Sequence, residues 1–231
     1  MLTKKFFGRS ALPTNKLALA QLTIQKKIIT IPRTEFSWFK ILFWLTKRYI
    51  PINPKNTPSR EIGEIFFPWN ILISKSTIKG CEEILSESDK NFFDVICVPV
   101  GSGGTFSGLI NSSLEKQKIL GFSALNNSNI SEVINKFVKK DNWKLFEESF
   151  FGGYAKFNDE LINFINNFYK KHNIRLDSIY NAKMIFRIID LINKNDWVFG
   201  KNILIINTGG TQSVEGINKL LKKKGCETIN Y

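Results

Sequence analysis

A pattern occurs twice in this chain, in which an apolar strand runs into a glycine-rich loop and then into a helix. The first copy reads ICVPVGSGGTFSGLINSSL over residues 96–114, and the second reads KNILIINTGGTQSVEGINKLL over residues 201–221. The apolar, β-branched runs suit strands that are buried on both faces. The glycines suit turns whose backbone angles other residues avoid. The presence of two such units raises the question of which ligand their loops could bind.

The rest of the chain continues the alternation of strands and helices. Strands are predicted over residues 26–31, 93–100, 118–125 and 201–207, and helices over 105–114, 131–140, 158–171, 179–194 and 211–223. Such alternation predicts an α/β fold with a mainly parallel sheet flanked by helices on both faces. Residues 81–231 are expected to form the well-defined α/β domain, and residues 1–80 a partial N-terminal region.

The composition narrows the class of protein. The chain has 231 residues, of which 43% are hydrophobic, and no apolar run reaches the roughly 18 to 20 residues of a membrane span. The most apolar stretch, FSWFKILFWL at residues 36–45, is too short and contains Lys40. The three cysteines are odd in number and widely spaced, which favours neither disulfides nor a metal site. We therefore expect a cytoplasmic protein with no bound metal and no membrane partner.

The net charge of +13 raises the question of nucleic-acid binding. The lysines are spread along the chain together with many Asn, Ile and Phe residues, a mixture typical of an A+T-rich coding bias. The tightest cluster, Lys222 to Lys224, ends the last predicted helix, where cations complement the helix dipole. We therefore expect no specific nucleic-acid partner and rank a basic binding module last among the possible functions.

The loop GSGGT has the physical properties of an anion site. Its glycines let the main chain come close to a ligand, and successive N–H groups can converge on an anion at the positive end of the following helix. Ser102 and Thr105 add hydroxyl donors. The pattern is neither a Walker loop nor the dinucleotide fingerprint, and a tight turn without a ligand is the alternative. The second loop also follows a strand, at the sheet edge where α/β proteins bind ligands.

Three segments together resemble a known family. The sequences VGSGGTFSGLIN, FGGYAKFNDELINFINNFYKKHNIRLDSIYNAKMIFRIIDLI and INTGGTQSVEGIN occur in this order. They are similar to the C-terminal part of the pyridoxal-phosphate enzymes grouped as 1-aminocyclopropane-1-carboxylate deaminase and D-cysteine desulfhydrase. The resemblance is close from residue 81 to about residue 218. It implies the tryptophan synthase β-like fold (PLP fold type II), pyridoxal 5′-phosphate as cofactor, a small amino acid as substrate, and a homodimer.

The resemblance also implies roles for individual residues. Family members hold the cofactor phosphate in the first glycine loop, place the Thr-Gly-Gly loop near the pyridine ring, lay one tyrosine over the cofactor for the chemistry, and direct another to the substrate. These positions correspond here to Gly101, Ser102, Gly103, Gly104 and Thr105, to Thr208, Gly209 and Gly210, to Tyr180 as the catalytic residue, and to Tyr154 as the substrate-binding residue. Without the resemblance, both tyrosines would be interpreted as structural aromatics.

The chain departs from the family in its N-terminal part. The family's cofactor lysine lies in a Ser-Gly-Asn-Lys segment followed by a serine turn, and neither is found. Thr14-Asn15-Lys16 is a partial match that makes Lys16 a candidate for this lysine, but its distance to PRTEF at residues 32–36 fits a later family segment, Asn-Pro-Thr-Leu, better. After Phe67-Pro68 the chain reads WNILISKST in place of a family glycine loop, and Asn181 stands where relatives carry Thr or Glu.

Two hypotheses follow from these departures. The first is an enzyme that releases ammonia from a small amino acid and leaves a 2-oxo acid, with sulfide as well when the substrate is D-cysteine. The second is a truncated or decayed relative that retains the fold or weak cofactor binding without catalysis. Because groups that act together lose most of their rate when one is missing, we expect little or no activity from this polypeptide alone.

Overall fold

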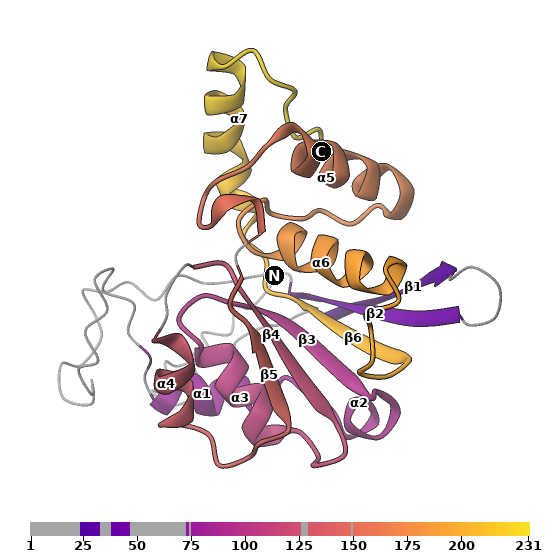
Figure 1. Ribbon diagram of the computed structural model, residues 1–231, viewed down its shortest axis with the longest axis vertical. Helices are drawn as coiled ribbons and strands as arrows, with labels where there is room; N and C mark the ends of the chain where they lie inside the picture. Colours follow the sequence, from indigo (N-terminus) through magenta and orange to yellow (C-terminus); the bar gives the residue numbers. More distant parts are fainter. Residues whose placement is uncertain (1–23, 33–37, 47–72, 74, 126–128, 149) are drawn as a thin grey trace, which may run out of the picture.

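The chain folds around one six-stranded sheet that lies between two groups of helices (Figure 1). The computed structural model describes the main chain of residues 24–32 and 38–46, and the main and side chains of residues 73, 75–125, 129–148 and 150–231. The predicted α/β class with a mainly parallel sheet is confirmed.

The sheet has the strand order β1-β2-β6-β3-β4-β5. Only β1 runs antiparallel to its neighbour, and the other four pairings are parallel. The strands are β1 (Ile24–Pro32), β2 (Trp38–Thr46), β3 (Val95–Val100), β4 (Lys118–Ser123), β5 (Trp143–Phe146) and β6 (Asn202–Asn207). The four predicted strands correspond to β1, β3, β4 and β6, whereas β2 and β5 were not predicted.

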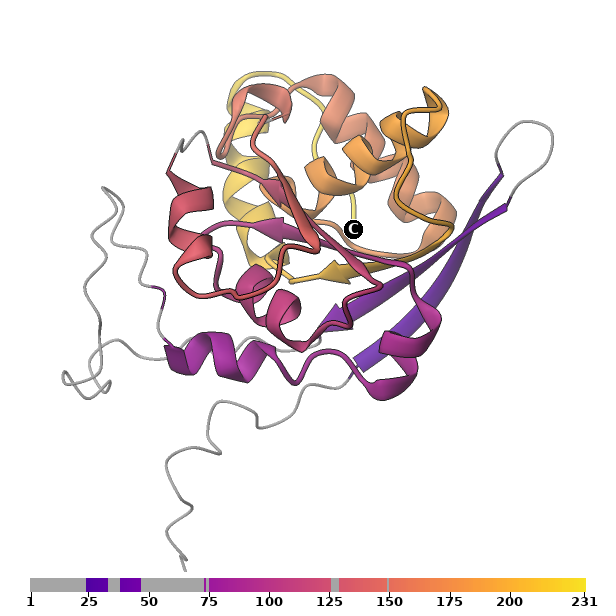
Figure 2. The same cartoon turned by 60° about the horizontal axis from the view of Figure 1, so that its bottom comes forward.

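Two strands from the N-terminal region extend this sheet. The β2 strand pairs in parallel with β6, with Leu42 opposite Leu204, and β1 then pairs with β2 along its whole length. Figure 2 shows this pair reaching out beyond the rest of the sheet. The apolar stretch at residues 36–45, too short for a membrane span, thus supplies most of a strand. The domain division after residue 80 stays a prediction.

Helices cover both faces of the sheet, as predicted. They are α1 (Lys75–Cys81), α2 (Glu87–Phe92), α3 (Gly104–Ser112), α4 (Ile130–Asn135), α5 (Asp159–His172), α6 (Asn181–Asn193) and α7 (Val214–Lys223). Val95 and Cys97 of β3 pack in one core with α5, α6 and α7, and Ile96 and Val98 pack in the other with α3 and α4. The period-two alternation of a strand explains why successive residues enter different cores.

Local sequence signals set several helix boundaries. The Asn158 side chain accepts a hydrogen bond from the Leu161 N–H at 3.0 Å, so the predicted N-cap of α5 is confirmed. Ser86 and Asp89 form a capping box at the start of α2, a helix that was not predicted. The α4 helix ends at Asn135, earlier than the predicted residue 140.

The described residues include three free thiols, those of Cys81, Cys97 and Cys226. In the part of the chain that the structure describes, no helix is both long enough and apolar enough to cross a bilayer. The same residues contain no group of three or more His, Cys, Asp and Glu side chains that could hold a metal ion.

Candidate functional site

The candidate site lies where β3, β4 and β6 end. These strands are parallel, so their last residues, Val100, Ser123 and Asn207, come to the same edge of the sheet. Because β3 pairs with β6, the loops that follow the two strands leave this edge side by side. The structure therefore brings the two predicted glycine loops together, at the edge where open α/β sheets bind ligands.

The first loop, residues 101–105, is a tight turn from β3 into α3. Gly103 is the N-cap residue of α3 and has φ 95°, ψ −7°, a left-handed conformation that favours glycine. The first helical hydrogen bond follows at once, from the Ser107 N–H to the Gly103 carbonyl at 2.8 Å. A Cβ atom on Gly103 would lie 3.0 Å from Cγ1 of Ile134. This glycine is thus required by backbone angle and by packing.

The main-chain N–H groups of residues 102–105 are available to bind a ligand. They donate to no hydrogen-bond acceptor among the residues that the structure describes. Residues 99–106 surround a hollow with about 200 Å³ of free space, open solvent included. Unengaged N–H groups at the positive end of a nine-residue helix are what an anion needs. The geometry of this loop fits a phosphate group.

Tyr180 lies against this loop. A Cβ atom on Gly101 would lie 3.4 Å from the Tyr180 ring and 3.5 Å from its hydroxyl, which is ordinary van der Waals contact, so the ring packs beside the loop. The Tyr154 ring, on an exposed side chain, lies 6.0 Å from the Tyr180 ring, centroid to centroid. Burial, with a contribution from Tyr154, raises the pKa of Tyr180 to about 12. Near neutral pH the Tyr180 phenol is therefore protonated and can donate a hydrogen bond.

The second loop, Thr208 to Gly210, is held by the start of α6. The Asn181 side chain accepts a hydrogen bond from the Thr208 N–H at 3.2 Å and donates one to the Gly209 carbonyl at 2.8 Å. The Gly209 N–H donates to the Asn207 side chain at 3.0 Å. The N–H groups of residues 208 and 209 are therefore engaged within the protein.

Asp177 organises the start of α6. Its carboxylate accepts hydrogen bonds from the main-chain N–H groups of Ile179, Tyr180 and Asn181 at 2.9, 2.7 and 3.0 Å. It also accepts one from the Asn181 side chain at 2.5 Å. Burial raises the pKa of Asp177, and these hydrogen bonds oppose the rise. The sequence analysis did not single out Asp177, although an Asp just before a helix is a familiar capping signal.

Lys183 is a second residue that the sequence analysis missed. Only 6% of this residue is exposed, and Nζ donates a hydrogen bond to the Gly153 carbonyl at 2.5 Å. Burial lowers the pKa of the Lys183 ammonium to about 8, and the Asp177 carboxylate opposes this shift. No sequence signal separates this lysine from the many others, because its burial depends on the packing of α6.

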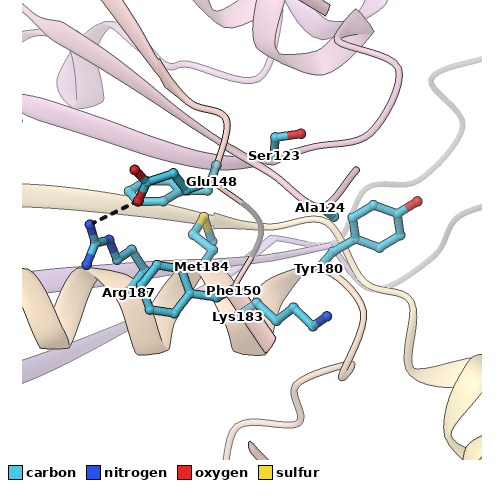
Figure 3. Close-up of a pocket in the computed structure, with 9 residues that line it drawn as sticks. Ser123, Ala124, Glu148, Phe150, Tyr180, Lys183, Met184 and Arg187 are labelled. Carbon is cyan, nitrogen blue, oxygen red and sulfur yellow. Dashed lines mark ion pairs between the residues drawn. The ribbon is translucent and has the colours of Figure 1, made fainter. Parts of the chain in front are cut away.

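A second hollow lies beside Lys183 and has about 270 Å³ of free space, open solvent included (Figure 3). Its lining comprises Phe122, Ser123, Ala124, Glu148, Phe150, Tyr180, Lys183, Met184 and Arg187. The Arg187 guanidinium lies 3.9 Å from the Glu148 carboxylate across it. Tyr180 thus contacts the first glycine loop and also lines this second hollow.

Comparison with known proteins identifies relatives of this chain. No protein-family model matches the chain. Proteins named "putative 1-aminocyclopropane-1-carboxylate deaminase" are 29% identical in Pyrococcus horikoshii, over 58% of this chain, and 30% identical in Pyrococcus furiosus, over 51% of this chain. The chain is a relative of these Pyrococcus proteins. The resemblance stated from the sequence motifs is thereby confirmed.

The similarity is partial in length. The matched segments cover 44% and 40% of the two Pyrococcus relatives, so the chain spans less than half of their length. A solved structure described as an ACC deaminase homologue is 25% identical, with a TM-score of 0.49, over 63% of this chain and 49% of that one.

The structure places Tyr154, Tyr180 and both glycine loops at one sheet edge, while their roles stay predictions. Lys16, Phe67 and Pro68 lie outside the described residues.

Proposed function

We propose that this chain binds pyridoxal 5′-phosphate at the carboxyl edge of its sheet, with the phosphate in the loop from Gly101 to Thr105. One observation carries the proposal: the N–H groups of residues 102–105 have no acceptor within the described chain, and they lie at the start of α3 beside Tyr180. The similarity to the Pyrococcus relatives supports the identity of the anion, since their family uses this cofactor.

Each part of the site has a separate task in this proposal. The loop N–H groups, with the hydroxyls of Ser102 and Thr105, bind the phosphate. Tyr180 covers the cofactor as a protonated phenol, and the Thr208 hydroxyl is directed to the cofactor ring. Tyr154 lies exposed beside Tyr180 and meets the amino-acid substrate. When bound, the cofactor supplies an electron sink for a carbanion, and the protein supplies binding and orientation.

The reaction that fits this site is release of ammonia from a small amino acid, such as 1-aminocyclopropane-1-carboxylate or D-cysteine. The competing function is cofactor binding without catalysis. Because the family's Ser-Gly-Asn-Lys segment and serine turn are not found in the sequence, we propose that the polypeptide alone has little or no activity. Ammonia release from either amino acid, above the background of free cofactor, would favour the enzyme. Bound cofactor without ammonia would favour the non-catalytic relative.

Cofactor binding itself is tested by a matched pair of variants at Ser102. Ser102→Asp places a carboxylate among the N–H groups proposed for the phosphate, and two anions about 4 Å apart repel by several kcal/mol at an effective dielectric constant of about 20. Ser102→Asn has nearly the same shape without the charge. Equilibrium dialysis of the full chain with pyridoxal phosphate should show binding at least about tenfold weaker for Ser102→Asp than for Ser102→Asn.

The Ser102→Asp variant separates binding from stability. A negative charge next to a helix N-terminus is favourable, so its thermal unfolding should occur at or above the wild-type temperature. Equal cofactor affinity in wild-type protein and Ser102→Asp would refute the phosphate site.

A further inference from the structure

The buried lysine of α6 lies close to the proposed cofactor site. Among the residues whose side chains the structure describes, Lys183 is the only buried lysine. Lys183 lies in the first turn of α6, three positions after the N-cap residue Tyr180, and the two residues line the same hollow. Figure 3 shows its side chain extending in the same direction as the Tyr180 ring. Lys183 thus shares a hollow with Tyr180, which lies against the phosphate loop.

The surroundings of Lys183 favour a reactive amine. Nζ has a single hydrogen-bond partner among the described residues, the Gly153 carbonyl, and no carboxylate there lies within ion-pair distance of it. The Asp177 carboxylate, before α6, acts electrostatically on Lys183, and the Glu148–Arg187 pair lines the same hollow. Burial in such surroundings favours the neutral amine, which is the form that attacks a carbonyl carbon.

From this geometry we propose that Lys183 is the amine that captures the aldehyde of pyridoxal phosphate when the phosphate lies in the loop from Gly101 to Thr105. This inference rests on the proposed cofactor site and adds a covalent anchor to it. It assigns the amine to Lys183 rather than to Lys16, which lies outside the described residues. The loop before α3 and the lysine of α6 would then both hold the cofactor.

The covalent step is a condensation. The neutral Lys183 amine adds to the aldehyde carbon, a carbon–nitrogen double bond forms, and the carbonyl oxygen leaves as water with the two amine hydrogens. No oxidant or reductant takes part. Borohydride then delivers a hydride to the carbon of that double bond, and the resulting secondary amine is stable to digestion, so the modified lysine can be located by mass spectrometry.

The experiment treats the full chain with less than one equivalent of pyridoxal phosphate, reduces it with borohydride, and maps the modified lysines after proteolysis. We expect most of the label on Lys183 and its loss in Lys183→Arg. The exposed Lys170 of α5 provides the control, because Lys170→Arg should leave the yield unchanged. Ser102→Asp should lower labelling of Lys183 at least about fivefold. Pyridoxal, which lacks the phosphate, should label Lys183 of the wild-type protein as weakly as pyridoxal phosphate labels Ser102→Asp.

The outcomes separate this inference from the proposed function. Cofactor binding that responds to Ser102→Asp, with the label on Lys16 or another lysine or on none, would overturn the role of Lys183 and leave the phosphate site intact. Labelling of Lys183 that is equal for pyridoxal and its phosphate would overturn both. Circular dichroism of each variant before labelling establishes that a lost label does not reflect unfolding.

Discussion

The two glycine loops of this protein begin alike and are used differently. Each follows a parallel strand, and each contains a glycine with nearly the same left-handed conformation, Gly103 at φ 95° and Gly210 at φ 96°. In the first loop the N–H groups of residues 102–105 have no acceptor within the described chain. In the second, those of residues 208 and 209 donate to asparagine side chains.

This difference distinguishes a loop whose N–H groups are available to a ligand from a loop whose N–H groups are partly taken up by the fold. The first N–H groups of a helix have no partner within the helix, so those of the first loop can donate to a bound anion or to solvent. In the second loop the N–H groups of Thr208 and Gly209 are already taken up by asparagine side chains. A shared sequence pattern of strand, glycines and helix therefore does not imply a shared role.

Substitution of Asn181 should have the largest effect on stability, because its side chain holds the second loop. Asn181→Ala would remove the partners of the Thr208 N–H and the Gly209 carbonyl and one donor to Asp177. Leaving such groups unpaired costs about 3 kcal/mol in total, which corresponds to a fall in melting temperature of about 10 °C. Thermal unfolding measures the fall, and hydrogen exchange should show faster exchange at Thr208.

Ser102→Ala in the first loop serves as the control for Asn181→Ala. Its hydroxyl makes no hydrogen bond to a described residue, so the free energy of unfolding should change by less than about 0.5 kcal/mol. If Ser102→Ala were the more destabilising of the two, the distinction between the loops would be wrong.

Substitution of the left-handed glycine in each loop should lower stability by a smaller amount. Gly103→Ala and Gly210→Ala should each destabilise the fold by about 2 kcal/mol, because left-handed angles are unfavourable for alanine. The new methyl groups also meet Ile134 at 3.0 Å and Asp177 at 3.2 Å. Urea unfolding measures the cost, and Gly216→Ala, in open space on α7, should not destabilise the protein.

The glycine variants should differ in their effect on cofactor binding. We expect Gly103→Ala to weaken binding of pyridoxal phosphate more than Gly210→Ala does, because only the first change moves N–H groups that are proposed to bind phosphate. The reverse order would assign the phosphate to the second loop.

The last prediction concerns the pH dependence of stability and Lys183, which lies on α6. The start of this helix contacts both loops. Its pKa is lowered to about 8 from the ordinary 10.5, so the unfolded chain binds more protons between these values. The stability of wild-type protein relative to Lys183→Met should therefore rise as pH increases from about 8 towards 10, by about 2 kcal/mol. Urea unfolding of both proteins at several pH values measures it, and a constant difference would contradict the buried, titrating amine.

The sequence predicted the elements around the site well, because their signals are local or periodic. Strands β3, β4 and β6, the glycine turn before α3 and the N-cap at Asn158 were all predicted. The β5 strand was missed because it has only four residues, Trp143–Phe146. The β2 strand was missed because its apolar run was considered only as a possible membrane segment.

By itself, the sequence determined that two strand–glycine–helix units exist and that the first can form an anion-binding turn, since backbone freedom and helix polarity belong to the residues of the turn. The tertiary structure alone decided that β6 lies beside β3 and that Asn181 takes up the N–H group of Thr208. It also decided that Lys183, alone among the lysines whose side chains the structure describes, is buried, and that it lines the same hollow as Tyr180. Strand order and burial arise from contacts between residues far apart in the chain, and no local pattern encodes them.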